Sequence, residues 1–162
     1  MAIRAFSRAL AASAVVLSSC AYSFRGNLPG HIESVRVAPF RSTVSEYGLE
    51  QETTALVTEK LVESGGLSVV TSSPDALIEA TVSQWNRSPY SYSASEQIEE
   101  YRLEMRVTLS FTDLVRDEPI LDDESVSRWI VYNPGTEDYV SARARLVEDI
   151  STEIVRRCLS GW

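Results

Sequence analysis

The sequence predicts an α+β domain in which two helices pack on a mainly antiparallel four-stranded sheet, in the order β-α-β-β-β-α. One stretch, Glu99–Thr112, alternates strictly between apolar and polar side chains, which is typical of a strand with one buried face. Two other stretches place apolar residues at helical spacing. Because each element is apolar on one side only, the simplest arrangement lays both helices on one face of the sheet.

The first strand is predicted at Ile32–Phe40, where polar and apolar residues alternate. Thr43 and Glu46 then have the spacing of a capping box, which predicts that a helix begins there. Gly65-Gly66 can supply the left-handed conformation that ends this helix. Its predicted apolar stripe is Leu49, Thr53, Leu56, Val57 and Leu61.

Two further strand candidates, Leu67–Val70 and Ala76–Trp85, flank a turn at Ser72–Asp75. The pattern leaves open whether they are two strands or two parts of one broken strand. In the long strand Glu99–Thr112 the odd-numbered side chains are predicted to be buried and the even-numbered ones exposed. Asp117–Pro119 predicts a turn, so the following strand, Ile120–Tyr132, should complete a hairpin.

The last helix is predicted to begin after Thr136 as its cap, with Glu137 and Asp138 in its first turn. Arg156 and Arg157 fall in its last turn, where positive charge suits the helix dipole. Its apolar stripe is Tyr139, Ala142, Leu146, Val147, Ile150, Ile154 and Cys158.

The N-terminus has the pattern of an export signal, with Arg4 and Arg8 before an apolar run that is too short to cross a bilayer. The run ends in Leu17-Ser18-Ser19-Cys20, which resembles the lipobox of bacterial lipoproteins. We therefore predict a signal peptide at 1–19, lipid attachment at Cys20, a lipidated segment at 20–30 and a single α+β domain at 31–162. The alternative is an ordinary secretory signal with a chance cysteine at its end.

Composition excludes nucleic-acid binding. Residues 1–19 contain two of the 15 basic residues and none of the 23 acidic ones, so the mature part has a formal charge near −10. A nucleic-acid-binding protein needs a basic surface, which such a chain does not offer. With Cys20 lipidated, Cys158 has no intramolecular partner, and we expect a buried thiol near the end of a helix rather than a reactive one.

No catalytic, metal or cofactor site is predicted. The single histidine, His31, has no acidic or cysteine cluster at ligand spacing and is expected on the surface or in a turn. The acidic run Asp122-Asp123-Glu124 could be imagined as catalytic carboxylates. Adjacent residues of a strand point to opposite faces, so a solvated hairpin end is the better interpretation.

One stretch, Gln84–Tyr92, combines arginine with aromatic residues and has no clear period, so we expect a loop that contacts a partner. These side-chain types are favoured at interface hot spots. The candidate contacts are Trp85, Arg87, Tyr90 and Tyr92, followed by Arg102 and Arg106 on the even-numbered face of the long strand. The alternative is that Trp85 and one tyrosine cap the end of the sheet.

Several strings in order along the mature chain resemble the LptE family of lipopolysaccharide-assembly lipoproteins. They are Cys20-Ala21-Tyr22-Ser23-Phe24-Arg25-Gly26, Leu28-Pro29, His31-Ile32, Tyr47-Gly48-Leu49-Glu50 and Glu100-Tyr101-Arg102-Leu103-Glu104-Met105. Their order, spacing and attachment to a lipobox carry the resemblance, which covers essentially the whole mature chain.

The resemblance implies a lipid-anchored protein on the periplasmic face of the outer membrane of a Gram-negative envelope. It also implies two partners, lipopolysaccharide and the large LptD β-barrel that delivers it to the outer leaflet, and no covalent chemistry. Two other classes stay open at this point. One is a lipoprotein that serves another envelope machine, in peptidoglycan synthesis or barrel insertion, and the other is a lipoprotein hydrolase.

Overall fold

The computed structural model describes residues 28–160. The predicted signal peptide, Cys20 and most of the predicted lipidated segment lie outside the described residues. Within them the chain forms two helices and six strands. In order these are β1 (Ser34–Val37), β2 (Arg41–Ser42), α2 (Leu49–Ser64), β3 (Ser68–Val69), β4 (Ala76–Tyr92), β5 (Ile98–Asp113), β6 (Glu118–Tyr132) and α3 (Tyr139–Ser160).

The α+β class is confirmed, but the four-stranded, mainly antiparallel sheet is wrong. The sheet is mixed and has six strands in the order β3-β1-β4-β5-β6, with β2 also paired to β4. β1 runs parallel to both β3 and β4, whereas β4, β5 and β6 form an antiparallel meander. Parallel neighbours need a long crossover, and α2 provides it between β1 and β3.

The first predicted strand is in fact two. The segment Ile32–Phe40 contributes only β1, and the chain then pairs again as β2 after Pro39. Proline has no backbone N–H to donate to a sheet, so the ladder is interrupted there. The two later candidates are separate strands, because β3 and β4 pair with β1 on its two sides.

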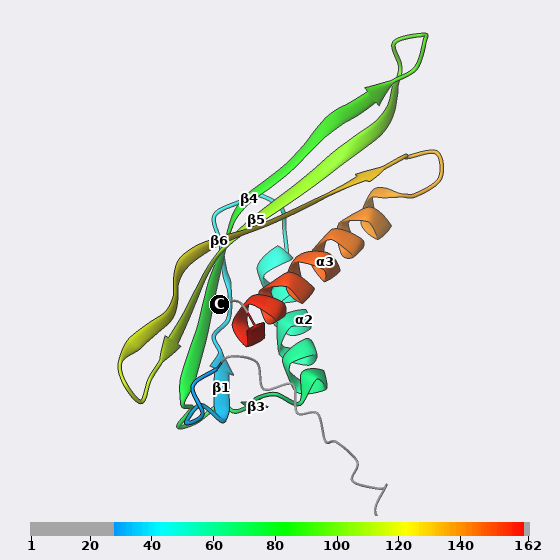
Figure 1. Cartoon of the computed structure of the whole chain (residues 1–162). Coiled ribbons are helices and arrows are strands. Elements are labelled where there is room, and N and C mark those ends of the chain that lie inside the picture. Colours follow the sequence, from blue (N-terminus) through cyan, green and yellow to red (C-terminus); the bar gives the residue numbers. More distant parts are fainter. Residues whose placement is uncertain (1–27, 161–162) are drawn as a thin grey trace, which may run out of the picture.

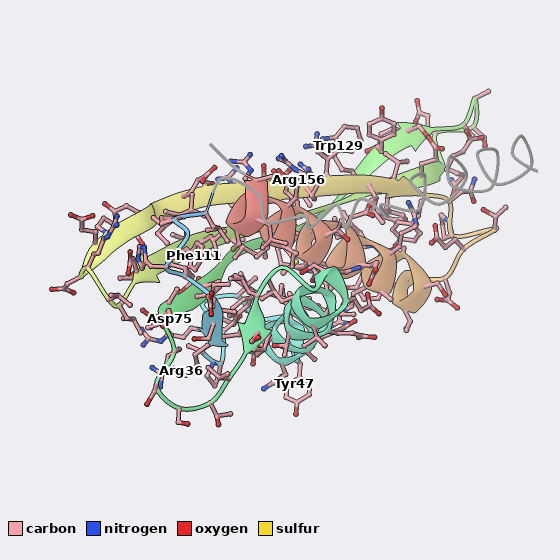
Figure 2. All side chains as sticks on the ribbon, turned by 60° about the horizontal axis from the view of Figure 1, so that its bottom comes forward. Arg36, Tyr47, Asp75, Phe111, Trp129 and Arg156 are labelled. Atoms are coloured by element: carbon pink, nitrogen blue, oxygen red, sulfur yellow. The ribbon has the colours of Figure 1, made fainter. Side chains whose placement is uncertain are left out.

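Both helices lie on one face of the sheet, as predicted (Figures 1 and 2). The core fills the space between these layers, and its largest completely buried side chains include Phe111, Leu103, Leu49 and Ile150. The predicted stripe of α3 is buried from Ala142 to Cys158, with Tyr139 partly buried. We call the helix-covered side of the sheet the inner face and the other side the outer face.

The alternation along β5 is confirmed. Leu103, Met105, Val107, Leu109 and Phe111 are each 0% exposed, while no even-numbered residue of this strand is buried. β6 pairs with β5 as the predicted hairpin, although it begins at Glu118, before the predicted Ile120.

Both predicted helix starts are wrong. Thr43 continues the pairing with β4, since its amide and hydroxyl both donate to the carbonyl of Val82, and α2 begins only after Gly48, whose φ of 80° is left-handed. In α3 the cap is Asp138, whose Oδ1 accepts from the Ser141 amide at 2.7 Å. Hydrogen bonds from Ser141 lower the pKa of Asp138, and the hydroxyl of Thr136 donates to the Asn133 carbonyl instead. The predicted end of α2 is confirmed, with Gly65 at φ 62°.

The predicted loop Gln84–Tyr92 is wrong as well, because β4 continues through it to Tyr92. Its partner is β5, and the two strands project together beyond the helices (Figure 1). A register shift between Val82 and Gln84 marks a bulge at Ser83. Directly paired residues of antiparallel strands share a face, so this bulge moves Trp85, paired with Met105, to the inner face.

Candidate functional site

The structure divides the six predicted contact residues among three places. Trp85 and Arg87 pair with Met105 and Leu103, so they lie on the inner face, next to the start of α3. Arg102 and Arg106 lie on the outer face. Tyr90 and Tyr92 lie near the end of the projecting β4–β5 pair, where they are 54% and 60% exposed. These residues therefore do not form one site.

Arg87 is surrounded by tyrosine rings. Its guanidinium carbon lies 3.9 Å from the ring centroid of Tyr101, 5.4 Å from that of Tyr139 and 5.6 Å from that of Tyr132. The rings of Tyr101 and Tyr132 also stack on each other, with centroids 5.8 Å apart. A cation over aromatic faces is attracted by their quadrupoles. Arg87 thus joins β4, β5, β6 and the start of α3.

Trp85 extends this contact into a polar network. Its Nε1 donates to the hydroxyl of Tyr139 at 3.3 Å, and that hydroxyl donates to Glu46 Oε1 at 2.8 Å. Arg143 pairs with Glu46 at 3.3 Å and with Glu52 at 2.5 Å. Burial, together with the hydrogen bond to Glu46, raises the pKa of Tyr139. The network fixes the base of the projecting strand pair to both helices, so Trp85 and Arg87 have internal partners.

Arg87 is exposed, so its replacement by alanine should lower the free energy of unfolding by about 1 kcal/mol, through loss of its cation–π contacts with the tyrosine rings. Arg106→Ala is the matched control, because Arg106 lies on the outer face and its ion pair with Glu104 is long, at 3.8 Å. That variant should change stability by less than about 0.5 kcal/mol. Urea unfolding of both variants measures the difference, and equal losses would contradict the assigned faces.

The outer face carries the second group of predicted contacts. Arg102 lies over the ring of Trp129, 4.6 Å from its centroid, and pairs with Glu104 at 3.1 Å. Trp129 is paired in register with Glu104 and is 53% exposed on the side of the sheet away from the helices (Figure 2). Neither helix covers this face, so Trp129 and part of Arg102 remain accessible there.

The single histidine lies in a turn, as expected, and contacts a buried acid. His31 Nε2 is 2.6 Å from Oδ2 of Asp113, which is buried. Burial alone would raise the pKa of Asp113, but hydrogen bonds from the Arg116 amide, His31 and the Val115 amide lower it. Asp75 nearby accepts from the amides of Glu33 and Ser34. These contacts tie the start of the described chain to the sheet.

The acidic run at 122–124 does not converge. Asp122 and Asp123 are exposed at an irregular part of β6, where Asp123 has a left-handed φ of 47°, while Glu124 pairs with Arg157 of α3. In the described part of the chain no three histidine, cysteine or acidic side chains are placed to hold a metal ion. Cys158 is a buried thiol, as expected, and burial raises its pKa to about 12.

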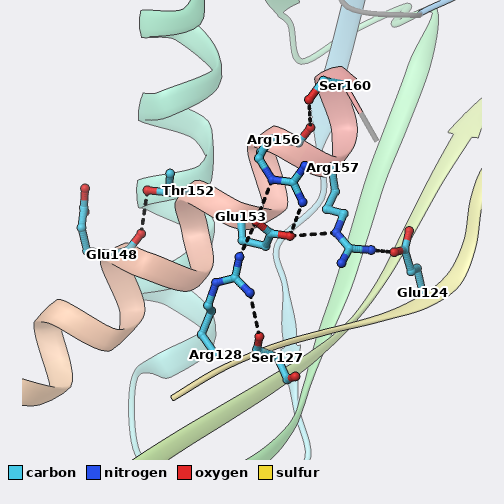
Figure 3. Close-up of polar contacts among 9 residues, drawn as sticks. All are labelled: Glu124, Ser127, Arg128, Glu148, Thr152, Glu153, Arg156, Arg157 and Ser160. Atoms are coloured by element: carbon cyan, nitrogen blue, oxygen red, sulfur yellow. Dashed lines mark hydrogen bonds and ion pairs between the residues drawn. The ribbon is translucent and has the colours of Figure 1, made fainter. Parts of the chain in front are cut away.

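Sequence reasoning missed the largest ionic cluster. Glu153 of α3 is 5% exposed, yet three arginines bind its carboxylate: Arg128 of β6 at 2.5 Å, Arg156 at 2.5 Å and Arg157 at 2.8 Å (Figure 3). The spacing of Glu153 to Arg156 and Arg157 is i to i+3 and i+4, which places them on one side of a helix and was the available signal. Arg128 reaches Glu153 because the register of β6 pairs it with Met105 on the inner face, and the sequence alone does not show this register.

The surface of the described residues has shallow, open hollows. One, of about 210 Å³, lies beside β2 and β4 and is lined by Pro39, Arg41, Glu79, Ala80, Thr81, Thr108, Ser110 and Asp123. Among residues 28–160 no helix is long and apolar enough to cross a membrane. Within the described residues, exposed arginine and aromatic side chains lie on the outer face of the sheet, which neither helix covers, and near the end of the projecting strand pair.

Comparison with known proteins identifies the family. The sequence profile described as "LptE: Lipopolysaccharide-assembly" matches residues 32–160, which is nearly the whole described domain. The chain belongs to the LptE family, and the resemblance seen in the sequence is confirmed. This is a family of non-catalytic proteins of lipopolysaccharide assembly. A search among curated proteins found no match.

Solved structures share the fold at low sequence identity. A hypothetical protein from Chlamydia trachomatis has a TM-score of 0.58 and 11% identity, over 78% of this chain and 95% of that one. An uncharacterized lipoprotein B from Nitrosomonas europaea has a TM-score of 0.57 and 14% identity, over 82% and 84% of the two chains. The rare lipoprotein B from Shewanella oneidensis has a TM-score of 0.50 and 18% identity, over 76% and 90%.

Proposed function

We propose that this protein is an outer-membrane lipoprotein, anchored on the periplasmic face through Cys20, that associates with an LptD-type β-barrel and helps it to place lipopolysaccharide in the outer leaflet. The observation that carries the proposal is the family match, which runs from the first strand to the end of the last helix. The sequence adds the export signal and lipobox at 1–20. The role is binding and assembly, with no bond made or broken.

The placement of exposed side chains suggests how the domain meets a barrel. The β4–β5 pair projects beyond the helices and ends in Tyr90 and Tyr92, which retain apolar area in solvent. Tyrosine is among the side chains favoured at interface hot spots. Arg102 and Trp129 on the bare outer face form a second contact surface. We therefore assign partner contact to the projecting end and the outer face, and remove Trp85 and Arg87 from the candidates.

Depletion of the protein tests the proposed function. We expect surface lipopolysaccharide to fall and the barrel partner to accumulate in an incompletely folded form. In a pull-down from detergent-solubilised membranes, a very large β-barrel protein and lipopolysaccharide should co-purify with the chain. If peptidoglycan synthases or barrel-insertion proteins co-purify instead and surface lipopolysaccharide is unchanged, the protein serves another envelope machine.

Replacement of Cys20 by alanine should leave the protein unlipidated, so that it stays uncleaved or is released to the soluble periplasmic fraction. Mass spectrometry of the mature N-terminus of the unaltered protein checks the same assignment. An unmodified N-terminus at another residue would show that Cys20 is not the anchor. Recovery of the lipidated protein from the inner membrane would contradict the proposed location.

Replacement of both Tyr90 and Tyr92 by alanine should reduce co-purification of the barrel by roughly tenfold or more, because two exposed aromatic contacts are lost. The melting temperature should stay close to that of the unaltered protein. The matched control is Tyr47→Ala, since Tyr47 is 92% exposed but lies in the turn before α2, far from the projecting end (Figure 2). Equal recovery of the barrel with all three proteins would exclude the projecting end as a contact.

A further inference from the structure

The cluster around Glu153 carries an excess of positive charge on an acidic protein. Three guanidinium groups, of Arg128, Arg156 and Arg157, face two carboxylates, of Glu153 and Glu124. One positive charge is therefore left over, although the whole chain has a formal net charge of −8. A positive site of this kind attracts an anion locally, against the field of the remaining surface.

The buried carboxylate holds the guanidinium groups in fixed positions. Arg156 binds Glu153 through Nε at 2.8 Å and through Nη2 at 2.5 Å, and Arg157 binds it through Nε at 2.8 Å. Arg128 reaches it from β6 through Nη2, while its Nη1 donates to the Ser127 carbonyl at 3.2 Å. Figure 3 shows the three groups gathered around the one carboxylate, from two different elements. Their geometry is thus set before any ligand arrives.

These contacts leave hydrogen-bond donors facing solvent. A guanidinium group has five N–H donors. In each of the three arginines, the contacts with Glu153, Glu124 and the Ser127 carbonyl use only some of these donors. The side chains of Arg156 and Arg128 are 54% and 42% exposed, and that of Arg157 is 31% exposed. Arg143 provides the contrast, because its side chain is 16% exposed and lies between Glu46 and Glu52 with no positive charge to spare.

We propose that Arg128, Arg156 and Arg157 form a binding site for a phosphate group, either free or on a lipid headgroup. Arginine forks bind phosphate oxygens with paired, charge-assisted hydrogen bonds. A tetrahedral anion has acceptors in several directions, so it can accept from the N–H donors that Glu153 and Glu124 leave unused on these side chains of α3 and β6. Because Glu153 already orders these side chains, binding costs less conformational entropy. The site is separate from the contact surfaces proposed for the barrel.

A phosphate titration of the full lipidated chain in detergent tests the proposal. Inorganic phosphate is added at constant ionic strength, and phosphatidic acid is added in a second series with phosphatidylcholine as its control. We expect saturable binding by calorimetry. Binding of inorganic phosphate identifies a site for the free anion, whereas binding of phosphatidic acid alone identifies a lipid headgroup site. Either result supports the proposal, and no saturable binding in either series overturns it.

Two variants with opposite expected effects locate the site. Arg156→Gln should weaken binding by roughly tenfold or more, through loss of charge-assisted hydrogen bonds. Glu124→Gln removes a competing carboxylate that touches only Arg157 in the described chain, so it should tighten binding by roughly two- to fivefold. Arg116→Gln, at an exposed arginine of the β5–β6 turn, is the control and should leave binding unchanged.

Equal binding by the Arg156 and Arg116 variants would overturn the assignment. If Arg156→Gln fails to fold, Glu124→Gln decides alone, because unchanged or weaker binding there contradicts the proposed charge balance. Barrel co-purification is measured separately, so loss of phosphate binding with the barrel retained refutes this site without affecting the proposed function.

Discussion

Replacement of Leu103 by aspartate is expected to unfold the domain or to lower its free energy of unfolding by more than about 4 kcal/mol. Leu103 is 0% exposed and lies on the inner face of β5, where it is paired with Ile130 of β6. The change removes a buried apolar side chain and places a carboxylate in the core. Arg87, the cross-strand neighbour of Leu103 on β4, is already held by the tyrosine rings around it. Domains of this size are stable by only about 5–15 kcal/mol, so the loss is a large fraction of the total.

The matched control for this variant is Thr108→Lys on the same strand. Thr108 lies on the outer face, where a lysine can extend into solvent, and we expect a change within about 0.5 kcal/mol. Thermal and urea unfolding of the two variants measure the contrast. Similar melting temperatures would mean that the faces of β5 have been assigned in reverse.

Replacement of Glu153 by glutamine should cost about 3 kcal/mol, because it leaves three arginines without their buried counter-ion. Glu148→Gln is the control in the same helix. Glu148 pairs with Lys60 of α2, but its side chain is 50% exposed, so the loss there should stay below about 1 kcal/mol. Urea unfolding at neutral pH gives both values, and equal small losses would show that the cluster adds little to stability.

The Glu153 variant also has an expected pH dependence. The hydrogen bond from Arg156 and the charges of Arg128 and Arg156 lower the pKa of Glu153 below 4.5, its ordinary value. Its stabilisation is therefore fully present above the pKa of the unfolded chain and is lost as the pH falls through the lowered folded value. The difference between the unaltered protein and Glu153→Gln should shrink only below about pH 4.5. A difference already lost at pH 6 would contradict this assignment.

The sequence predicted those elements whose local pattern agrees with their tertiary surroundings. The strict alternation of β5 fixed both the strand and its buried face, because one side of the sheet is covered by helices and the other is not. The apolar stripe of α3 was predicted for the same reason. Gly65 ends α2 as predicted, since a left-handed residue after a helix strongly favours glycine.

The faces of β4 could not be predicted in this way. Ala76 to Val82 bury their even-numbered side chains, but the bulge at Ser83 reverses this order, so the odd-numbered Trp85 and Arg87 turn inward. The bulge depends on how β4 pairs with β5, and the residues of Gln84–Tyr92 give no local sign of it. Pro89 is accommodated within β4 next to a register irregularity.

The helix starts failed for a related reason. Thr43 has the residue type and spacing of a cap, but its amide and hydroxyl both bind the Val82 carbonyl of β4. Side chains that can cap a helix can also bind other backbone groups. Here Thr43 binds β4, which is distant in sequence, instead of capping α2. For the candidate site, the sequence pointed to arginine and aromatic side chains but could not show which of them already have partners within the fold.

The mixed sheet has a consequence for how the chain folds. β4, β5 and β6 are joined by short turns and pair along almost their whole length, so this meander closes only small loops as it forms. β1 pairs with β3 and β4 only after the chain has passed through α2. The paired residues, Ser34 with Ser68 and Val35 with Ala76, are therefore far apart in sequence. Contacts between residues far apart in sequence cost chain entropy, because a long loop must close before they can form. We therefore expect the meander with α3 to form first and the N-terminal strands, nearest to the predicted membrane anchor, to join the sheet last.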